Sequence, residues 1–236
     1  MFVTAVLLDL DGLLVDTEPL QVEALRAAVA PLGVTLPNDY VAAKIVGVSD
    51  TQNAVDIAAD FGLTIDPGEI VKRKDREFVK LAAGQTIAAR PGLWEFMTRI
   101  RPRAARLGLV SSSSRQTVDA IFGGVASPAG HGSLADCFDL IVTGSDVALA
   151  KPAPAVYQHA LTALGVATES CVAVEDSAAG VTAARAAGIR CLAVPNALTR
   201  GQDFSEAWLV CRSLGAAASA IEALLPAEGA SGRCRE

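Results

Sequence analysis

The pattern of apolar and polar positions changes period repeatedly along the chain. Short apolar runs, typical of buried strands, alternate with segments in which apolar residues recur every three or four positions, as in helices. A first strand is predicted at residues 3–10. After residue 90 the pattern predicts strands at 106–110, 138–143, 171–174 and 190–194, and helices near 92–101, 114–123, 153–164 and 178–187. This alternation predicts an α/β fold, a Rossmann-like parallel sheet with helices on both faces.

Residues 15–88 interrupt the alternation because their apolar positions follow helical spacing only. Pro19 can occupy the first turn of one helix, and further helices are predicted to begin near residue 49 or 50 and near residue 66. We therefore predict a small all-helical cap domain, residues 15–88, inserted after the first strand. The core domain would comprise residues 1–14 and 89–236. Closure of such a cap would exclude water from a site beneath it.

Two aspartates and a glycine follow the first strand in the sequence LLDLDGLLVDTE. Because strand side chains alternate, we expect the carboxylates of Asp9 and Asp11 to face one point. Carboxylates that close repel each other unless a cation or a proton lies between them. Gly12 leaves room for a ligand near the backbone. Taken alone, an Asp-Gly pair is equally consistent with an ordinary turn.

Three further polar signals lie at the carboxyl ends of later strands or at the helix starts that follow: Ser111, Lys151 and the pair Glu175–Asp176. Ligands of parallel sheets bind at this edge. Each signal has an ordinary alternative. Ser111 heads a run of four serines that could cap a helix, Lys151 could be a surface lysine, and Glu175–Asp176 could be a solvated strand end. The four signals together favour a functional site.

In this order, the signals resemble the motifs of the haloacid dehalogenase-like superfamily, in the group with a helical cap known as subfamily I. The stretch DGLLVDTEPL is most similar to sugar-phosphate phosphatases and β-phosphoglucomutases. The resemblance implies that Asp9 is a nucleophile that forms an aspartyl-phosphate and that Asp11 is the general acid and base. It also implies phosphate binding by Ser111, Ser112 and Lys151.

A metal ion is part of the same prediction. Two carboxylates and a phosphate dianion repel one another, so a hard divalent cation is required, and oxygen ligands beside a phosphate indicate Mg²⁺. The resemblance assigns as ligands the carboxylate of Asp9, the main-chain carbonyl of Asp11 and the carboxylate of Asp176. Glu175 would be a further ligand or a neighbour of the ligands.

Three cap residues are predicted to face the substrate: Glu18, Gln21 and Lys74. In the mutases of this group, a histidine and an arginine of the cap assist transfer to a second sugar hydroxyl. The aligned positions here are Gln21 and Asp50, so water is the expected acceptor. Lys74 lies in the charged stretch KRKDREFVKL, which is about equally consistent with a solvated helix face.

The predicted function is a Mg²⁺-dependent phosphatase that hydrolyses a small phosphorylated metabolite, a sugar phosphate, through an aspartyl-phosphate. One alternative is a β-phosphoglucomutase-like mutase. Another, from a different class, is a noncatalytic phosphosugar-binding module, although such a module has no need for both Asp9 and Asp11. A dehalogenase is disfavoured because it needs neither Asp11 nor a metal.

Composition and charge restrict the expected partners and cellular location of the protein. The 236 residues carry a formal net charge of −6, which disfavours nucleic acid as a partner. No apolar run approaches the length of a membrane span, and the chain begins in strand pattern without a signal peptide. The five cysteines form no CxxC pair, so we expect reduced thiols. These features predict a soluble, cytoplasmic enzyme, a monomer or weak homodimer, whose partner is its small-molecule phosphorylated substrate.

A few segments and residues receive no functional role. We expect neither His131 nor His159 to be catalytic, because neither belongs to a motif. The stretch 123–133, GGVASPAGHGS, is predicted to be a mobile loop. The tail from Ala227 is predicted to be disordered.

Overall fold

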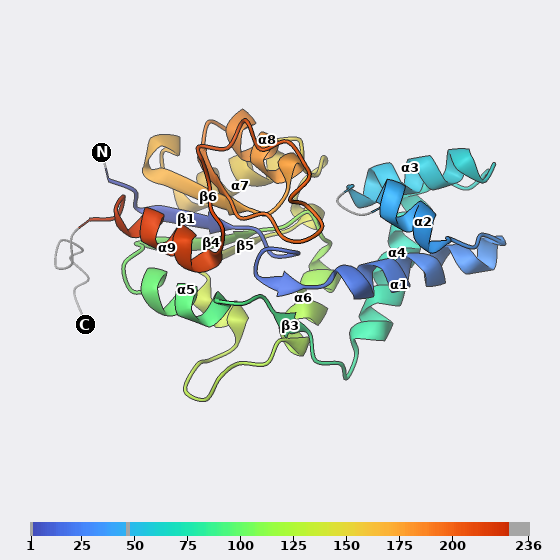
Figure 1. Cartoon of the computed structure of the whole chain (residues 1–236), viewed down its shortest axis with the longest axis horizontal. Helices are drawn as coiled ribbons and strands as arrows, with labels where there is room; N and C mark the ends of the chain where they lie inside the picture. The colour runs from blue at the N-terminus through green and yellow to red at the C-terminus, as the bar shows by residue number, and fades with distance from the viewer. Residues whose placement is uncertain (1, 46–47, 227–236) are drawn as a thin grey trace.

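A parallel six-stranded sheet forms the centre of the molecule in the computed structural model, which describes residues 2–45 and 48–226 (Figure 1). The strand order is β5-β4-β1-β6-β7-β8. The strands are β1 (Ala5–Leu8), β4 (Arg106–Val110), β5 (Leu140–Val142), β6 (Cys171–Glu175), β7 (Arg190–Ala193) and β8 (Leu209–Val210). Leu8 pairs with Leu109 on one side and with Val174 on the other, so β1 is central. The predicted fold class is confirmed.

Helices cover both faces of this sheet. Helices α5 (Leu93–Ile100), α6 (Arg115–Gly124) and α9 (Leu214–Glu222) pack on one face, and α7 (Ala155–Leu164) and α8 (Ala178–Ala186) pack on the other (Figure 1). Strand β1 shows how the sequence makes two cores. Its side chains alternate between the faces, so Val6 and Leu8 join the first core while Ala5 and Leu7 join the second.

A bundle of helices forms the cap beside the sheet (Figure 1). It contains α1 (Glu18–Val29), α2 (Asn38–Tyr40), α3 (Asp50–Asp60) and α4 (Pro67–Ala82). Leu25, Val29, Ile57 and Ile70 form a separate apolar core within it. The predicted helix starts are confirmed, because Ser49 caps α3, Asp66 caps α4 and proline stands in the first turn of α1.

Two short antiparallel strands connect the cap with the sheet. Strand β2 (Val15–Asp16) pairs with β3 (Ala88–Ala89), so the chain enters and leaves the cap side by side. The exact limits of the two predicted domains stay a prediction. Single turns of 3₁₀- or π-helix complete the elements: Ala30–Leu32, Val41–Ile45, Leu134–Cys137, Gly144–Asp146 and Thr168–Ser170.

Some expectations change and others stay open. Strand β1 ends at Leu8, two residues before its predicted end, and β8 and α9 were not predicted. The predicted tail from Ala227 lies outside the described residues. Within the described ranges, the helices are all too short or too polar to cross a bilayer, and Cys137, Cys171, Cys191 and Cys211 form no disulfide. Mobility of residues 123–133 and a cytoplasmic location stay predictions.

The turn after β1 requires glycine. Gly12 has a φ of 78°, in the left-handed region, and a Cβ atom there would lie 2.3 Å from Oδ2 of Asp176. Gly62, between α3 and α4, has a φ of 62° but has nothing within 4 Å of its Cβ position. Both positions need a left-handed backbone, but an added Cβ atom would collide with a neighbouring side chain only at Gly12.

We expect Gly12→Ala to destabilise the protein more than Gly62→Ala does. Both variants lose about 1–2 kcal/mol because alanine is disfavoured at positive φ, and Gly12→Ala must also displace the Asp176 carboxylate. Urea denaturation with EDTA present measures the two free energies of unfolding. Equal losses would show that the turn has room for a side chain.

Candidate active site

The predicted site residues meet in a cleft of about 930 Å³ between the sheet and the cap. Strands β1, β4 and β6 are parallel neighbours, so their carboxyl ends lie at the same edge of the sheet and form the floor of this cleft. The core contributes Asp9, Asp11, Ser111, Ser112, Lys151 and Asp176 to its lining, and the cap contributes Glu18, Gln21, Asp50 and Lys74.

A buried ammonium group lies between two carboxylates on the cleft floor. Nζ of Lys151 is 2.6 Å from Oδ1 of Asp9 and 2.6 Å from Oε1 of Glu175, and it donates to the carbonyl oxygen of Val110 at 2.8 Å. Lys151 is 5% exposed, Asp176 6%, and Glu175 is fully buried. The alternatives of a surface lysine and a solvated strand end are therefore wrong.

Burial controls the charges of this group. It raises the pKa of Asp9 to about 8, an effect that Lys151 opposes and that the negative charge of Glu175 strengthens. Burial alone would lower the pKa of Lys151, but Asp9 and Glu175 raise it above its ordinary value. The lysine therefore remains a cation. One ammonium group does not fully compensate the buried acids around it.

Asp11 has partners of its own. Four side chains donate hydrogen bonds to its carboxylate: Thr17 at 2.6 Å and Gln21 at 3.1 Å to Oδ1, and Ser113 at 2.9 Å and Ser111 at 3.4 Å to Oδ2. Asp9 and Asp11 line the same cleft with different hydrogen-bond partners, and the expectation that they face one point stays a prediction. Strand β1 ends at Leu8, so the alternation of strand side chains does not extend to Asp11.

The four consecutive serines have different hydrogen-bond partners. Ser114 caps α6, since its Oγ accepts from the backbone N–H of Thr117. The alternative that this run caps the next helix is therefore correct for Ser114, whereas Ser111 has other partners. Ser111 is buried and accepts from the N–H of Ser113 at 3.0 Å, while Ser112 is exposed and accepts from the N–H of Lys151 at 3.3 Å. Both hydroxyl-bearing residues line the cleft.

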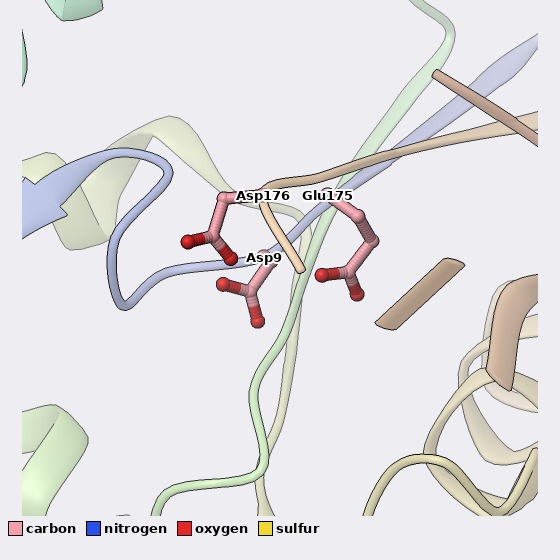
Figure 2. A group of neighbouring side chains, drawn as sticks. All are labelled: Asp9, Glu175 and Asp176. Atoms are coloured by element: carbon pink, nitrogen blue, oxygen red, sulfur yellow. The ribbon is translucent and has the colours of Figure 1, made fainter. Parts of the chain in front are cut away.

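Three acidic side chains could hold a metal ion. Oxygens of Asp9, Glu175 and Asp176 lie within 4.8 Å of one another, and Figure 2 shows the three carboxyl groups side by side. Oε1 of Glu175 is held by Lys151 and by the hydroxyl of Tyr157, whereas its Oε2 is buried without a hydrogen-bond partner among the described residues, so Glu175 also keeps an oxygen that could face a cation. Burial, and then the negative charge of Asp9, raises the pKa of Asp176 well above its ordinary value. A cation between Asp9 and Asp176 would relieve this repulsion.

The cap closes the cleft with an ion pair of its own. Lys74, on α4, is 5% exposed and is paired with Asp50 at the start of α3, so the alternative of a solvated helix face is wrong. Burial raises the pKa of Glu18, and the nearby Lys74 opposes this shift. Gln21 turns toward the core and donates to Asp11. These three predicted cap residues line one cleft, and their contact with substrate stays a prediction.

Sequence reasoning missed several residues of the site. Asn196 follows β7 and donates to Oδ2 of Asp176 at 2.7 Å, and Tyr157 on α7 donates to Glu175. Thr17 and Ser113 hold Asp11. Asn196 and Ser113 had a usable signal, because each lies just beyond the carboxyl end of a predicted strand. The two histidines, His131 and His159, do not line the cleft.

Comparisons with known proteins identify the family of this chain. The model of the haloacid dehalogenase-like hydrolases matches residues 3–188. Protein CbbY of Rhodobacter capsulatus is 33% identical over 235 residues, which cover 95% of this chain and 100% of the relative. The phosphorylated carbohydrates phosphatase of Thermotoga maritima is 30% identical over 208 residues, or 87% of this chain and 92% of the relative.

A solved structure of a second CbbY protein has the same fold as this chain. CbbY from Rhodobacter sphaeroides, crystallised in complex with xylulose-(1,5)bisphosphate, has a TM-score of 0.76 and 30% sequence identity to this chain. The match covers 91% of this chain and 95% of that chain. The family model matches well over half of the sequence, and the fold and the four motifs agree with it. The chain therefore belongs to the haloacid dehalogenase-like hydrolases, as its motifs predict.

Proposed function

We propose that this hydrolase is a Mg²⁺-dependent phosphatase that releases phosphate from a sugar monophosphate through an aspartyl-phosphate. The observation that carries the proposal is the buried group of Asp9, Lys151 and Asp176 at the floor of the cleft. A nucleophilic carboxylate, a fixed cation and a second carboxylate for a metal are what transfer of a dianionic phosphoryl group requires. The names of the relatives, a phosphorylated carbohydrates phosphatase among them, support a sugar-phosphate substrate.

The residues present fit a divalent cation. Asp9 and Asp176 are buried carboxylates in one cluster, and their mutual repulsion is only partly balanced by Lys151. They would hold Mg²⁺ together with the main-chain carbonyl of Asp11, and Glu175 would act as a neighbour that fixes Lys151. The bound ion would neutralise charge on the phosphate, so that a dianion can approach two carboxylates.

Asp9 and Lys151 would carry the first step. Lys151 holds Oδ1 of Asp9, which leaves Oδ2 to attack phosphorus as the bond from phosphorus to the sugar oxygen breaks. The Ser111 hydroxyl and the Lys151 ammonium would stabilise the charge that develops on the phosphoryl oxygens. The product of this step is an aspartyl-phosphate on Asp9 and a free sugar hydroxyl.

Asp11 would move the protons. It would protonate the departing sugar oxygen and then, as a carboxylate, take a proton from the water that hydrolyses the aspartyl-phosphate. Thr17 and Gln21 hold Asp11 from the side of the cap, and Ser113 holds it from the core. The proton shuttle therefore lies where the cap meets the core, beside the acceptor water.

The mutase alternative is weakened by the cap. Gln21 is engaged with Asp11, and Asp50 is engaged with Lys74. Neither position supplies a free basic group to orient a sugar phosphate for a second transfer. A noncatalytic binding module is weakened by the two aspartates, because carboxylates beside a bound phosphate lower its affinity and a module that only binds gains nothing from them.

We expect Asp9→Asn to reduce phosphate release by about a thousandfold or more, because the amide is not a nucleophile. Release of p-nitrophenol from p-nitrophenyl phosphate measures the rate, and circular dichroism checks the fold. Asp60→Asn on the surface of the cap is the matched control and should leave the rate unchanged. Appreciable activity of Asp9→Asn would exclude the covalent mechanism.

We expect chelation of divalent ions to stop turnover reversibly, and Mg²⁺ to restore it. Ca²⁺ should restore it poorly, because its longer and more variable coordination would misplace the phosphate relative to Asp9. Phosphate release after dialysis against EDTA, with each ion added back, measures both effects. Full activity after exhaustive chelation would reject the metal assignment and favour a metal-independent reaction.

We expect a hexose 6-phosphate or a similar monophosphate to yield free phosphate without a bisphosphate activator, because water is the acceptor. A sugar bisphosphate should be a poorer substrate, since Asp50 neutralises Lys74 and the cap then offers a distal phosphate no net positive charge. The preference is measured as the ratio of kcat/KM for the monophosphate to kcat/KM for the bisphosphate of the same sugar. Asp50→Asn should reduce this ratio. Asp60→Asn again serves as the control.

Two results would contradict this expectation. Conversion of β-glucose 1-phosphate to glucose 6-phosphate faster than phosphate release, with a trace of bisphosphate present, would identify a mutase. A preference of the wild-type enzyme for the bisphosphate would show that the Lys74–Asp50 pair opens when substrate binds.

A further inference from the structure

The side chain of Asn196 is fixed in one orientation by its own loop. Its Oδ1 accepts from the backbone N–H groups of Leu198 at 2.8 Å and Thr199 at 3.2 Å. Its backbone N–H donates to Oγ1 of Thr199 at 3.0 Å. A flip of the amide would place Nδ2 against two N–H donors, so Nδ2 must point away from the loop.

The fixed Nδ2 joins two other segments of the site. It donates to Oδ2 of Asp176 at 2.7 Å, at the end of β6, and to the carbonyl oxygen of Gly12 at 3.3 Å, in the turn after β1. A Cβ atom on Gly12 would lie 2.9 Å from Nδ2, so the space that glycine leaves is the space in which the amide lies. Three separate loops therefore meet at one side chain.

We propose that Asn196 is a positioning residue of the metal site. It holds Asp176 and the Asp11–Gly12 turn, which carry two of the predicted Mg²⁺ ligands, at a fixed separation. This inference rests on the proposed function and adds to it a residue that the four motifs do not include.

The chemistry of the amide suits this role. Lys151 compensates Asp9 with a full positive charge, whereas Asn196 fixes Asp176 with a neutral donor. The neutral donor orients the carboxylate and leaves its negative charge available to a cation. It also occupies Oδ2, so that Oδ1 remains for the metal. Outer hydrogen bonds of this kind typically contribute tenfold to a hundredfold to metal affinity.

The test is the affinity of the substrate-free enzyme for Mg²⁺, measured by isothermal titration calorimetry. Asn196→Leu keeps the approximate shape of the side chain and removes the donor, and Asn196→Ala removes both. We expect the dissociation constant for Mg²⁺ to rise at least about tenfold in each variant. Turnover at saturating Mg²⁺ should recover much of the wild-type rate, which damage to the fold would not allow.

Thr199→Val is the matched control. It removes a hydrogen bond of the same loop and leaves the Asn196 side chain in place, so its affinity for Mg²⁺ should stay within about twofold of the wild type. An equal loss in Thr199→Val would show that the loop as a whole, and not the amide, shapes the site. Asn196→Ser, which keeps a short polar group in the loop, replaces the other variants if thermal melts in EDTA show that they unfold.

The outcomes separate the inference from the proposed function. A wild-type enzyme that takes up no Mg²⁺ would remove the metal from the proposed function. A wild-type enzyme that binds Mg²⁺ while the Asn196 variants bind it equally well would overturn the inference and leave the proposed function in place.

Discussion

The buried ammonium group of Lys151 is the interaction on which the rest of the site depends. Asp9 and Glu175 lie at the ends of neighbouring strands, and no folding argument favours two negative charges there. Charges taken out of water are tolerated only with partners in good geometry, and removal of one partner from such a group typically costs about 3–5 kcal/mol. Lys151 contacts one oxygen of each carboxylate and is itself fixed by the Val110 carbonyl, while Oε2 of Glu175 has no hydrogen-bond partner in the described part of the chain.

The surrounding structure serves to keep this lysine in place. Tyr157, on the face of the sheet covered by α7, donates to Glu175 and lies with its ring 5.3 Å from the Lys151 ammonium. Gly180, in the first turn of α8, has no side chain because a Cβ atom there would lie 2.0 Å from Oε2 of Glu175. Helix packing on that face therefore positions Glu175, and Glu175 positions the lysine that holds Asp9.

The sequence predicts the parts of this arrangement that follow from backbone topology. Asp9, Ser111 and Glu175 each adjoin the carboxyl end of a predicted strand, and parallel pairing brings those ends together wherever they stand in the chain. Strand β8 escaped prediction because it has only two residues. Asn196 escaped because an asparagine after a strand usually belongs to a turn.

The burial of a charged residue in the cap could not be predicted from the sequence. The sequence around Lys74 has the composition of a solvated helix, and only the packing of α4 against α1 and α3 buries that lysine. Its partner Asp50 lies 24 positions away, a pairing that no local spacing indicates. Tertiary contacts decide whether such a charge is a surface group or part of a binding site, and the sequence states only that it is present.

In the proposed function, the core and the cap would divide the recognition of substrate between them. The core would offer the phosphate an ammonium group, serine hydroxyls and two carboxylates for a metal, all of which line the cleft. The cap side offers Glu18, Asp50 and a lysine whose charge Asp50 already balances. Under the proposed function, a ligand that suits both sides would be anionic at one end only and would present hydrogen-bond donors at the other. In the proposed function, the chemical step would depend on the strand ends, while the choice of substrate would depend on one ion pair in the cap.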